Sequence, residues 1–152
     1  MLVLFSLILS LKADPHYEQH YTWVETPLVY LCPETKVSEE SILLAIEYWI
    51  NRDYNISYGG KLSNCDNTQE KPGIYFIDNL KLDKVNYFGQ TQHFLNSKGE
   101  LVVAEVMISD KDNIHKYEEI SIHEIGHALG IEHSEDKNSI MYESHFAHMS
   151  LY

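Results

Sequence analysis

The sequence predicts an α+β fold in which a mixed β-sheet is backed by two helices. Two segments carry apolar residues at helical spacing, and the shorter apolar runs between them have the composition of strands. One pair of these runs flanks a glycine-containing turn, which is typical of a hairpin. With 152 residues, 44% of them hydrophobic, the chain is long enough to bury one continuous core as a single domain.

The first helix is predicted over residues 39–52. Ser38 has a suitable N-cap side chain, and Glu39 and Glu40 lie in the first turn, where carboxylates interact favourably with the helix dipole. Apolar residues recur at helical spacing and predict a face that packs on the core, formed by Ile42, Leu43, Ile46, Trp49 and Ile50. A second helix is predicted over residues 117–129, and Gly130 follows at the point where a left-handed residue ends many helices.

The strands are predicted from short apolar runs bounded by polar residues or glycine. They are expected at residues 27–31, 55–58 (ending at Gly59-Gly60), 74–77, 88–95 and 101–109. The last two flank Asn96-Ser97-Lys98-Gly99 and are expected to form the hairpin.

The net charge of −12 excludes several classes of partner. Phosphate groups repel such a surface, so nucleic acid is not an expected partner, and an anionic membrane surface is equally disfavoured. The acidic surface is interpreted as a solvating one, and a preference for cationic substrates is its alternative.

The N-terminal residues indicate export. Residues 1–11 form an apolar run of about half the roughly twenty residues that a stable membrane span needs. We interpret residues 1–13 as a signal peptide with Ala13 last before cleavage, residues 14–26 as an extended lead-in, and residues 27–152 as the folded, functional domain. The expected location is extracellular, or periplasmic in a bacterium. A buried N-terminal helix or strand is the alternative for the apolar run.

Two cysteines, Cys32 and Cys65, are the fewest that can form a disulfide, and an exported chain meets oxidising conditions. A bridge across this 33-residue separation contributes roughly 3.5–4 kcal/mol by the loop-entropy argument. Two unrelated thiols are the alternative, because sequence does not reveal proximity.

Residues 123–133 indicate a catalytic zinc site, with the sequence His-Glu-Ile-Gly-His-Ala-Leu-Gly-Ile-Glu-His. His123 and His127 are four residues apart, so on a helix both imidazoles face one side and can reach one ion. Gly130 permits a sharp turn, after which His133 can return as a third ligand. Three protein ligands leave the fourth zinc position open for water. Glu124, beside these ligands, is the predicted general base.

The motif continues into Ser139-Ile140-Met141-Tyr142, and the whole resembles the metzincin zinc peptidases, in which a Met-turn follows the extended histidine motif. Ser134 after the third histidine and the Met-Tyr pair are similar to the matrixin branch. Residues 88–92 and 104–108 resemble the edge strand and its neighbour in that branch. The resemblance is specific over residues 104–142, looser over 27–103, and absent from 1–20.

The resemblance implies a secreted, monomeric endopeptidase with one catalytic Zn²⁺ ion and a metzincin-like fold. The sheet would be twisted and mostly parallel with an antiparallel edge strand, packed on two main helices, with an irregular C-terminal Met-turn region. Met141 would form an apolar floor beneath the metal ligands. A protein or peptide substrate would lie along the edge strand, residues 88–94, and its specificity pocket would be walled by Tyr142, Glu143 and Ser144.

Other residues carry weaker predictions. Glu119, one turn before His123, is a further pocket candidate, and an exposed helix position is its alternative. The resemblance leaves room for Ca²⁺ as a second ion, but Asp110 and Asp112 alone do not make a convincing site. One of three N-terminal residues, Asp14, His16 or His20, is a candidate zinc ligand before the N-terminal segment is trimmed by proteolysis. A mobile tail is the alternative. Four histidines without ligand spacing are interpreted as surface or partly buried residues: His93, His115, His145 and His148.

Two rival functions remain open from the sequence. The first is an inactive zinc-binding scaffold that serves as a decoy or inhibitor. Glu124 argues against it, because that residue is not needed to hold zinc. The second is a metal-buffering protein, which the single ordered ligand set argues against.

Overall fold

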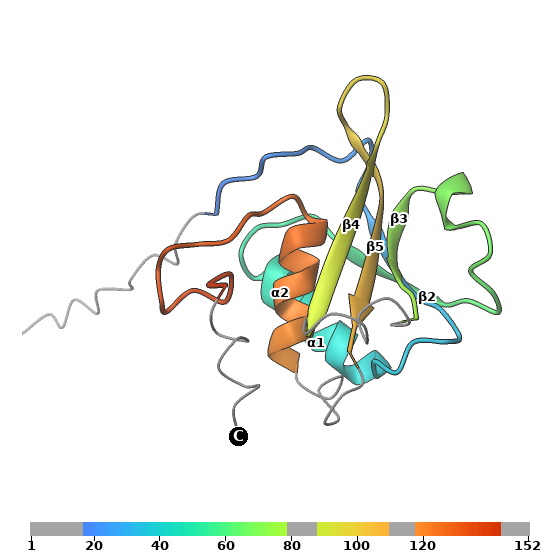
Figure 1. Ribbon diagram of the computed structural model, residues 1–152, viewed down its shortest axis with the longest axis horizontal. Helices are drawn as coiled ribbons and strands as arrows, with labels where there is room; N and C mark the ends of the chain where they lie inside the picture. The colour runs from blue at the N-terminus through green and yellow to red at the C-terminus, as the bar shows by residue number, and fades with distance from the viewer. Residues whose placement is uncertain (1–16, 79–87, 110–117, 144–152) are drawn as a thin grey trace, which may run out of the picture.

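The computed structural model describes residues 17–78, 88–109 and 118–143, and Figure 1 shows their arrangement. Several predictions fall outside these residues. They are the signal peptide at residues 1–13, the candidate residues Asp14, His16, Asp110, Asp112 and Ser144, and the histidines His115, His145 and His148. Among the described residues, no helix is both long and apolar enough to cross a membrane.

The described strands form one five-stranded sheet in the order β2-β1-β3-β5-β4. The strands are β1 (Leu28–Leu31), β2 (Ser57–Lys61), β3 (Gly73–Phe76), β4 (Gly89–Leu95) and β5 (Leu101–Ile108). β1 pairs in parallel with β2 and β3, and β3 pairs in parallel with β5. β4 pairs antiparallel with β5 and lies at one edge, so the prediction of a mostly parallel sheet with an antiparallel edge strand is confirmed.

Two helices cover one face of the sheet (Figure 1). α1 (Glu39–Ile50) packs against α2 (Glu118–Ala128), and α2 also packs against β4 and β5. A short 3₁₀ helix, η1, spans Thr68–Glu70. The main core lies between the helices and alternate residues of the central strands, among them Val29, Leu31, Ile74 and Phe76. The alternating residues Tyr30 and Tyr75 face the other side of the sheet, where a smaller apolar cluster lies.

α1 begins as the sequence predicts, because the Ser38 hydroxyl accepts a hydrogen bond from the backbone N–H of Ser41. Its end and its buried face differ from the prediction. The helix stops at Ile50, because Asp53 takes a left-handed φ of 65° and its N–H donates to the carbonyl of Ile50. Leu43 and Ile50 are 46% and 49% exposed, so their predicted place in the core is wrong.

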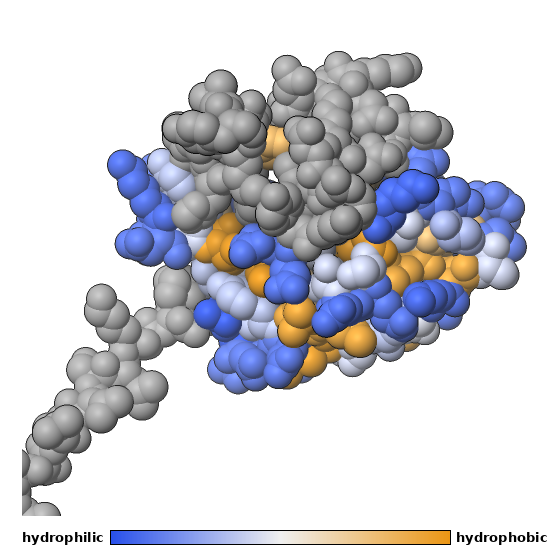
Figure 2. All heavy atoms as spheres, turned by 90° about the horizontal axis from the view of Figure 1, so that it is seen from below, coloured by the Kyte–Doolittle hydropathy of each residue, from blue (hydrophilic) through white to orange (hydrophobic). Residues whose placement is uncertain are grey.

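The core face of α1 is narrower than predicted and consists of Ile42, Ala45, Ile46 and Trp49. Leu43 and Ile50 are seven residues apart and therefore lie together on the neighbouring, solvent-facing side. On the face of the molecule in Figure 2, hydrophobic side chains likewise lie among hydrophilic ones.

The second strand also differs from its prediction, which placed it at residues 55–58 and ended it at Gly59-Gly60. Both glycines lie inside β2, and the register with β1 shifts beside them, between Val29 and Tyr30. The Tyr30 ring occupies the space where a side chain on Gly59 would lie. Here glycine accommodates a neighbouring aromatic ring and a bulge, and does not end the strand.

Cys32 and Cys65 are joined in a disulfide, with their Cα atoms 5.7 Å apart. The bond ties the end of β1 to the polar loop that follows β2. Cys32 is buried in the smaller apolar cluster, on the face of the sheet away from the two helices. The bridge is therefore separated from the residues that α2 positions.

Residues 17–26, named the N-terminal strap below, run in extended form along the edge of the domain. Isolated bridges join Gln19 to Ile131 and Trp23 to Leu101. Tyr17 is only 8% exposed and belongs to the main core. The strap thus connects the loop after α2 with the start of β5.

Candidate metal centre and catalytic site

The side chains of three histidines converge beside the C-terminal half of α2. His123 and His127 lie one turn apart on the helix, and their Nε2 atoms are 3.1 Å apart. The Nε2 atom of His133 is also 3.1 Å from that of His127. One ligand atom from each residue lies within 4.8 Å of the other two. The predicted histidine set is therefore brought to one place.

The turn at Gly130 directs His133 back toward the helix. Gly130 has a φ of 90°, and its N–H donates to the carbonyl of His127 over 2.8 Å. The N–H of Ile131 donates to the carbonyl of Gly126 over 3.0 Å. These two bonds form the Schellman arrangement, which ends a helix sharply and favours glycine at the left-handed residue. The local sequence thus determines the position of the third histidine.

The remaining imidazole nitrogens are bonded to the backbone. His123 Nδ1 lies 2.7 Å from the carbonyl of Ile140, and His127 Nδ1 lies 2.8 Å from that of Ile131. A carbonyl can only accept, so both Nδ1 atoms carry the proton, and in both rings Nε2 is the nitrogen that can bind a metal. Burial lowers the pKa of His127 to about 4, which favours the neutral ring that a metal requires.

The donor set fits zinc. A tetrahedral ion with bonds of about 2.0–2.1 Å separates two nitrogen ligands by roughly 3.3 Å, close to the two shorter spacings between Nε2 atoms. Three imidazoles, of which the two on the helix are oriented by backbone carbonyls, form an open set that leaves one ligand position for water.

Glu124 lies on the same turn as His123 and is 5% exposed. The hydroxyl of Thr91, on β4, donates to Glu124 Oε2 over 2.7 Å. Burial raises the pKa of Glu124 to about 7, and the bond from Thr91 opposes that rise. A carboxyl whose pKa lies near neutrality is suited to accept and return a proton at physiological pH.

Gly89, at the start of β4, allows the edge strand to approach Glu124. A Cβ at Gly89 would lie 2.7 Å from Cδ of Glu124, closer than real contacts permit. Only glycine therefore leaves the carboxylate in its present position. Gly89 and Thr91 are two residues apart and so face the same side of β4.

The Met-turn lies beneath α2. Met141 is fully buried, and its N–H donates to the Ser139 hydroxyl over 3.0 Å. Its carbonyl accepts a bond of 2.9 Å from the N–H of Ser134, directly after the third histidine. Tyr142 pairs with Ser134 through an isolated bridge and is half-buried. The turn thus holds the chain directly after His133.

The remaining candidate residues lie around this centre. Glu143 is exposed, and its Oε2 atom is 4.0 Å from His133 Nδ1. Glu119 is exposed in the first turn of α2, which agrees with the alternative prediction of an exposed helix position. Their part in a specificity pocket stays a prediction. The side chain of His20 lies 3.6 Å from that of Glu132 and its backbone N–H donates to Gly130, so it sits in the strap, beside the loop that carries His133.

Sequence reasoning missed the contributions of β4. The sequence places Thr91 and Gly89 only in an edge strand, and it predicts His93 only as a surface or partly buried residue. His93 Nε2 donates to the carbonyl of His127 over 2.7 Å. The signal was the alternation of residues 89, 91 and 93, which places all three on the face of β4 that α2 covers.

A cavity of about 340 Å³ adjoins two of the three histidines, His127 and His133. The His93 imidazole and the Tyr21 ring, whose centroids are 5.6 Å apart, contribute to its wall, together with His127, His133 and Glu132. The cavity therefore opens beside the second and third histidines, between β4, the strap and the loop that carries His133.

A mostly parallel sheet with an antiparallel edge strand, two helical histidines, a third after a glycine turn, and a methionine turn beneath them define a metzincin-type catalytic domain. The model of the Matrixin family matches residues 9–150. The chain belongs to the matrixin family, whose members are zinc metallopeptidases. A comparison with curated proteins gives no match.

Proposed function

We propose that this protein is an active zinc endopeptidase that hydrolyses internal peptide bonds, with His123, His127 and His133 as the ligands of one ion. The observation that carries the proposal is the position of Glu124. Glu124 directly follows His123 in α2, and its carboxylate is buried, bonded to Thr91 and given space by Gly89. None of these features is needed to hold a metal, and together they suit a general base.

The residues would divide the reaction as follows. Bound zinc supplies an acidified water and polarises the scissile carbonyl. Glu124 would accept a proton from the water and deliver it to the nitrogen of the leaving amine. Thr91 would keep Oε2 of Glu124 oriented while the other carboxylate oxygen exchanges the proton.

The substrate is proposed to bind along β4. Of the described strands β4 lies at one edge of the sheet, and its residues Gln90 and Gln92 are exposed. An extended peptide can pair with such an edge through its backbone, which places the scissile bond near Gly89 and Thr91. Side-chain specificity would come from pockets, for which Tyr142, Glu143, Ser144 and Glu119 remain the candidates.

We propose that the protein acts as a monomer outside the cell. The disulfide between Cys32 and Cys65 supports this location, because such bonds persist in oxidising compartments. Members of the matrixin family are typically extracellular, which also supports it.

Cleavage of a denatured protein by the purified chain, with and without a zinc chelator, tests the activity. We expect cleavage that the chelator abolishes and that readded zinc restores. Glu124→Gln should lower cleavage by about a thousandfold, the order that a general base contributes, while zinc binding persists. Glu118→Gln is the matched control, because it removes a carboxylate from the same helix at an exposed position and should leave cleavage unchanged. Zinc binding without cleavage by the unaltered chain would favour the inactive scaffold.

A further inference from the structure

The loop between the second and third histidines exposes backbone carbonyls that helix α2 cannot satisfy. The last carbonyls of any helix lack intrahelical partners. Here three consecutive carbonyls accept bonds from the N-terminal strap. Ala128 accepts from Trp23 Nε1 over 3.0 Å, Leu129 from Gln19 Nε2 over 2.9 Å, and Gly130 from the N–H of His20 over 2.9 Å.

The strap can lie against this loop because Gly130 has no side chain. A Cβ at Gly130 would lie 3.0 Å from the carbonyl oxygen of Tyr21 and 3.2 Å from its nitrogen. Gly130 therefore has two roles. It adopts the left-handed conformation of the turn, and it allows the backbone of the strap to approach the loop closely. The sequence pattern revealed only the first role.

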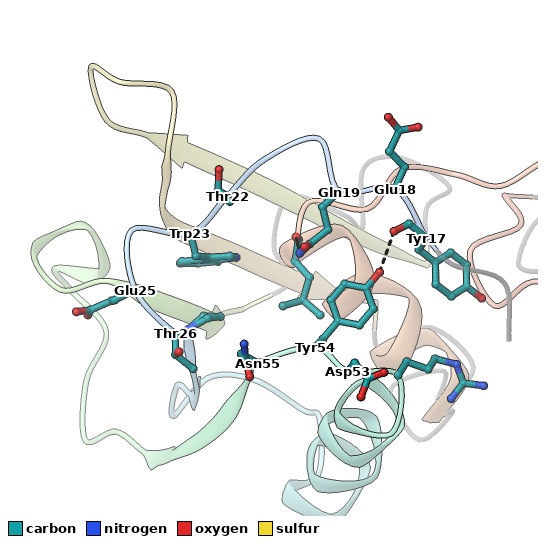
Figure 3. Close-up of a pocket in the computed structure, with 13 residues that line it drawn as sticks. Tyr17, Glu18, Gln19, Thr22, Trp23, Glu25, Thr26, Asp53, Tyr54 and Asn55 are labelled. Atoms are coloured by element: carbon teal, nitrogen blue, oxygen red, sulfur yellow. Dashed lines mark hydrogen bonds between the residues drawn. The ribbon is translucent and has the colours of Figure 1, made fainter. Parts of the chain in front are cut away.

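The strap is itself fixed at both ends. At its start, the Tyr17 ring packs edge-on against Trp49 with centroids 5.5 Å apart. The carbonyl of Tyr17 accepts from the Tyr54 hydroxyl over 3.1 Å, a bond visible in Figure 3 beside a cleft of about 830 Å³. At its other end, Thr22 and Val24 share two backbone bonds with Leu101 of β5. The donors of the strap are thus presented from the rigid core.

We propose that the N-terminal strap clamps the loop that carries His133, with Gln19 and Trp23 as positioning residues for the metal. The inference rests on the proposed metal site. Without the clamp, residues 128–133 would have to be ordered when the metal binds, and that entropic cost would weaken the affinity for the ion. With the clamp, the second and third ligands are held at their metal-bound spacing in advance.

A purely structural role is the competing explanation, because the strap donors also satisfy carbonyls and so stabilise the fold. The two roles differ in a measurable way. A structural bond that is equally strong with and without metal changes the stability of both forms alike and leaves the zinc affinity unchanged. A clamp changes the zinc affinity itself.

The test measures zinc affinity by competition with a chromophoric chelator, in full-length chains carrying Trp23→Phe, Gln19→Met or both. Phe keeps an aromatic ring and Met keeps the length of the stem, so each substitution mainly removes a donor. We expect zinc to bind roughly tenfold more weakly in each single variant, in the range that orienting groups around metal ligands show, and more weakly again in the double variant. Cleavage should recover when zinc is in excess.

Tyr58→Phe is the matched control, because it removes a hydroxyl bonded to Glu39 between β2 and α1, away from the loop. Its zinc affinity should equal that of the unaltered chain. Gln19 is exposed, so Gln19→Met should fold even if the double variant does not. Unchanged zinc affinity in Gln19→Met and Trp23→Phe, with lower melting temperatures, would overturn the clamp and leave the proposed function intact. Failure of the unaltered chain to bind zinc would overturn both.

Discussion

The sulfur of Met141 lies at the point on α2 where a side chain on Gly126 would begin. A Cβ at Gly126 would clash with Met141 Sδ and would lie 2.7 Å from Cζ2 of Trp49. Trp49 in turn donates from its indole nitrogen to the carbonyl of Ile122 over 2.8 Å. Helix α2, the Met-turn and α1 therefore meet at Gly126, which lies in the helical turn between His123 and His127.

Gly126→Ala should destabilise the protein despite its gain in helix propensity. Alanine in a helix interior gains about 1 kcal/mol over glycine, whereas overpacking a filled core costs about 1–3 kcal/mol. We expect a net loss of up to about 2 kcal/mol in the free energy of unfolding, measured by denaturant titration. Adding Met141→Ala, which opens the space, should make the pair less destabilising than the sum of the single changes. Strict additivity would contradict the contact.

Thr91→Val should impair the base without removing the metal. The hydroxyl bond lowers the pKa of Glu124, so its loss raises that pKa further. A base with a higher pKa is protonated at a higher pH, so the acidic limb of kcat/KM should move upward. We expect kcat at neutral pH to fall by about tenfold, the order of a contribution of about 1–2 kcal/mol from one bond to a charged group. Thr91→Ser keeps the hydroxyl and should therefore keep both kcat and the acidic limb at the values of the unaltered chain. An acidic limb at the same pH in Thr91→Val would refute the role of Thr91 in tuning Glu124.

The sequence predicted the parts of the site that are local. His123 and His127 are related by one helical turn, and Gly130 places His133 through two backbone bonds within five residues. Such features follow from helix geometry alone. The bond from Thr91 to Glu124 joins residues 33 apart, and those from Gln19 and Trp23 to the loop span 110 and 105 residues. They depend on how the sheet edge and the strap meet α2, which no local spacing encodes.

The same distinction between local and tertiary features explains why two predictions about the fold are wrong. The period of α1 predicted an apolar face correctly, but whether Leu43 and Ile50 are covered depends on the width of the surface that the sheet and α2 offer. Because glycine often ends strands, the sequence predicts a strand end at Gly59. In the structure, the position requires glycine because the Tyr30 ring on the neighbouring strand fills the space of a side chain. In both cases a tertiary contact overrides a local preference.

Tyr58 should make the stability of the protein sensitive to alkaline pH. Burial and the bond to Glu39 raise the pKa of Tyr58 to about 12, above the value of 10.0 expected in the unfolded chain. The folded state therefore retains this proton longer, so the contribution is complete below pH 10 and is lost as the pH rises to 12. Tyr58→Phe should flatten the dependence of the denaturation midpoint on pH between these limits. An unaltered slope would contradict the assignment.

Reduction of the disulfide should weaken the fold but spare the metal centre. The bond between Cys32 and Cys65 closes a loop with a sequence separation of 33, and its loss should cost roughly 3.5–4 kcal/mol of stability by the loop-entropy argument. Denaturant titration with and without reductant measures this, and a Cys32→Ser, Cys65→Ser double variant, already destabilised, should not respond to the reductant. Because Cys32 lies on the sheet face away from α2, zinc affinity in the absence of denaturant should be the same in both forms. An equal denaturation midpoint in both forms would show that the bridge does not stabilise the domain.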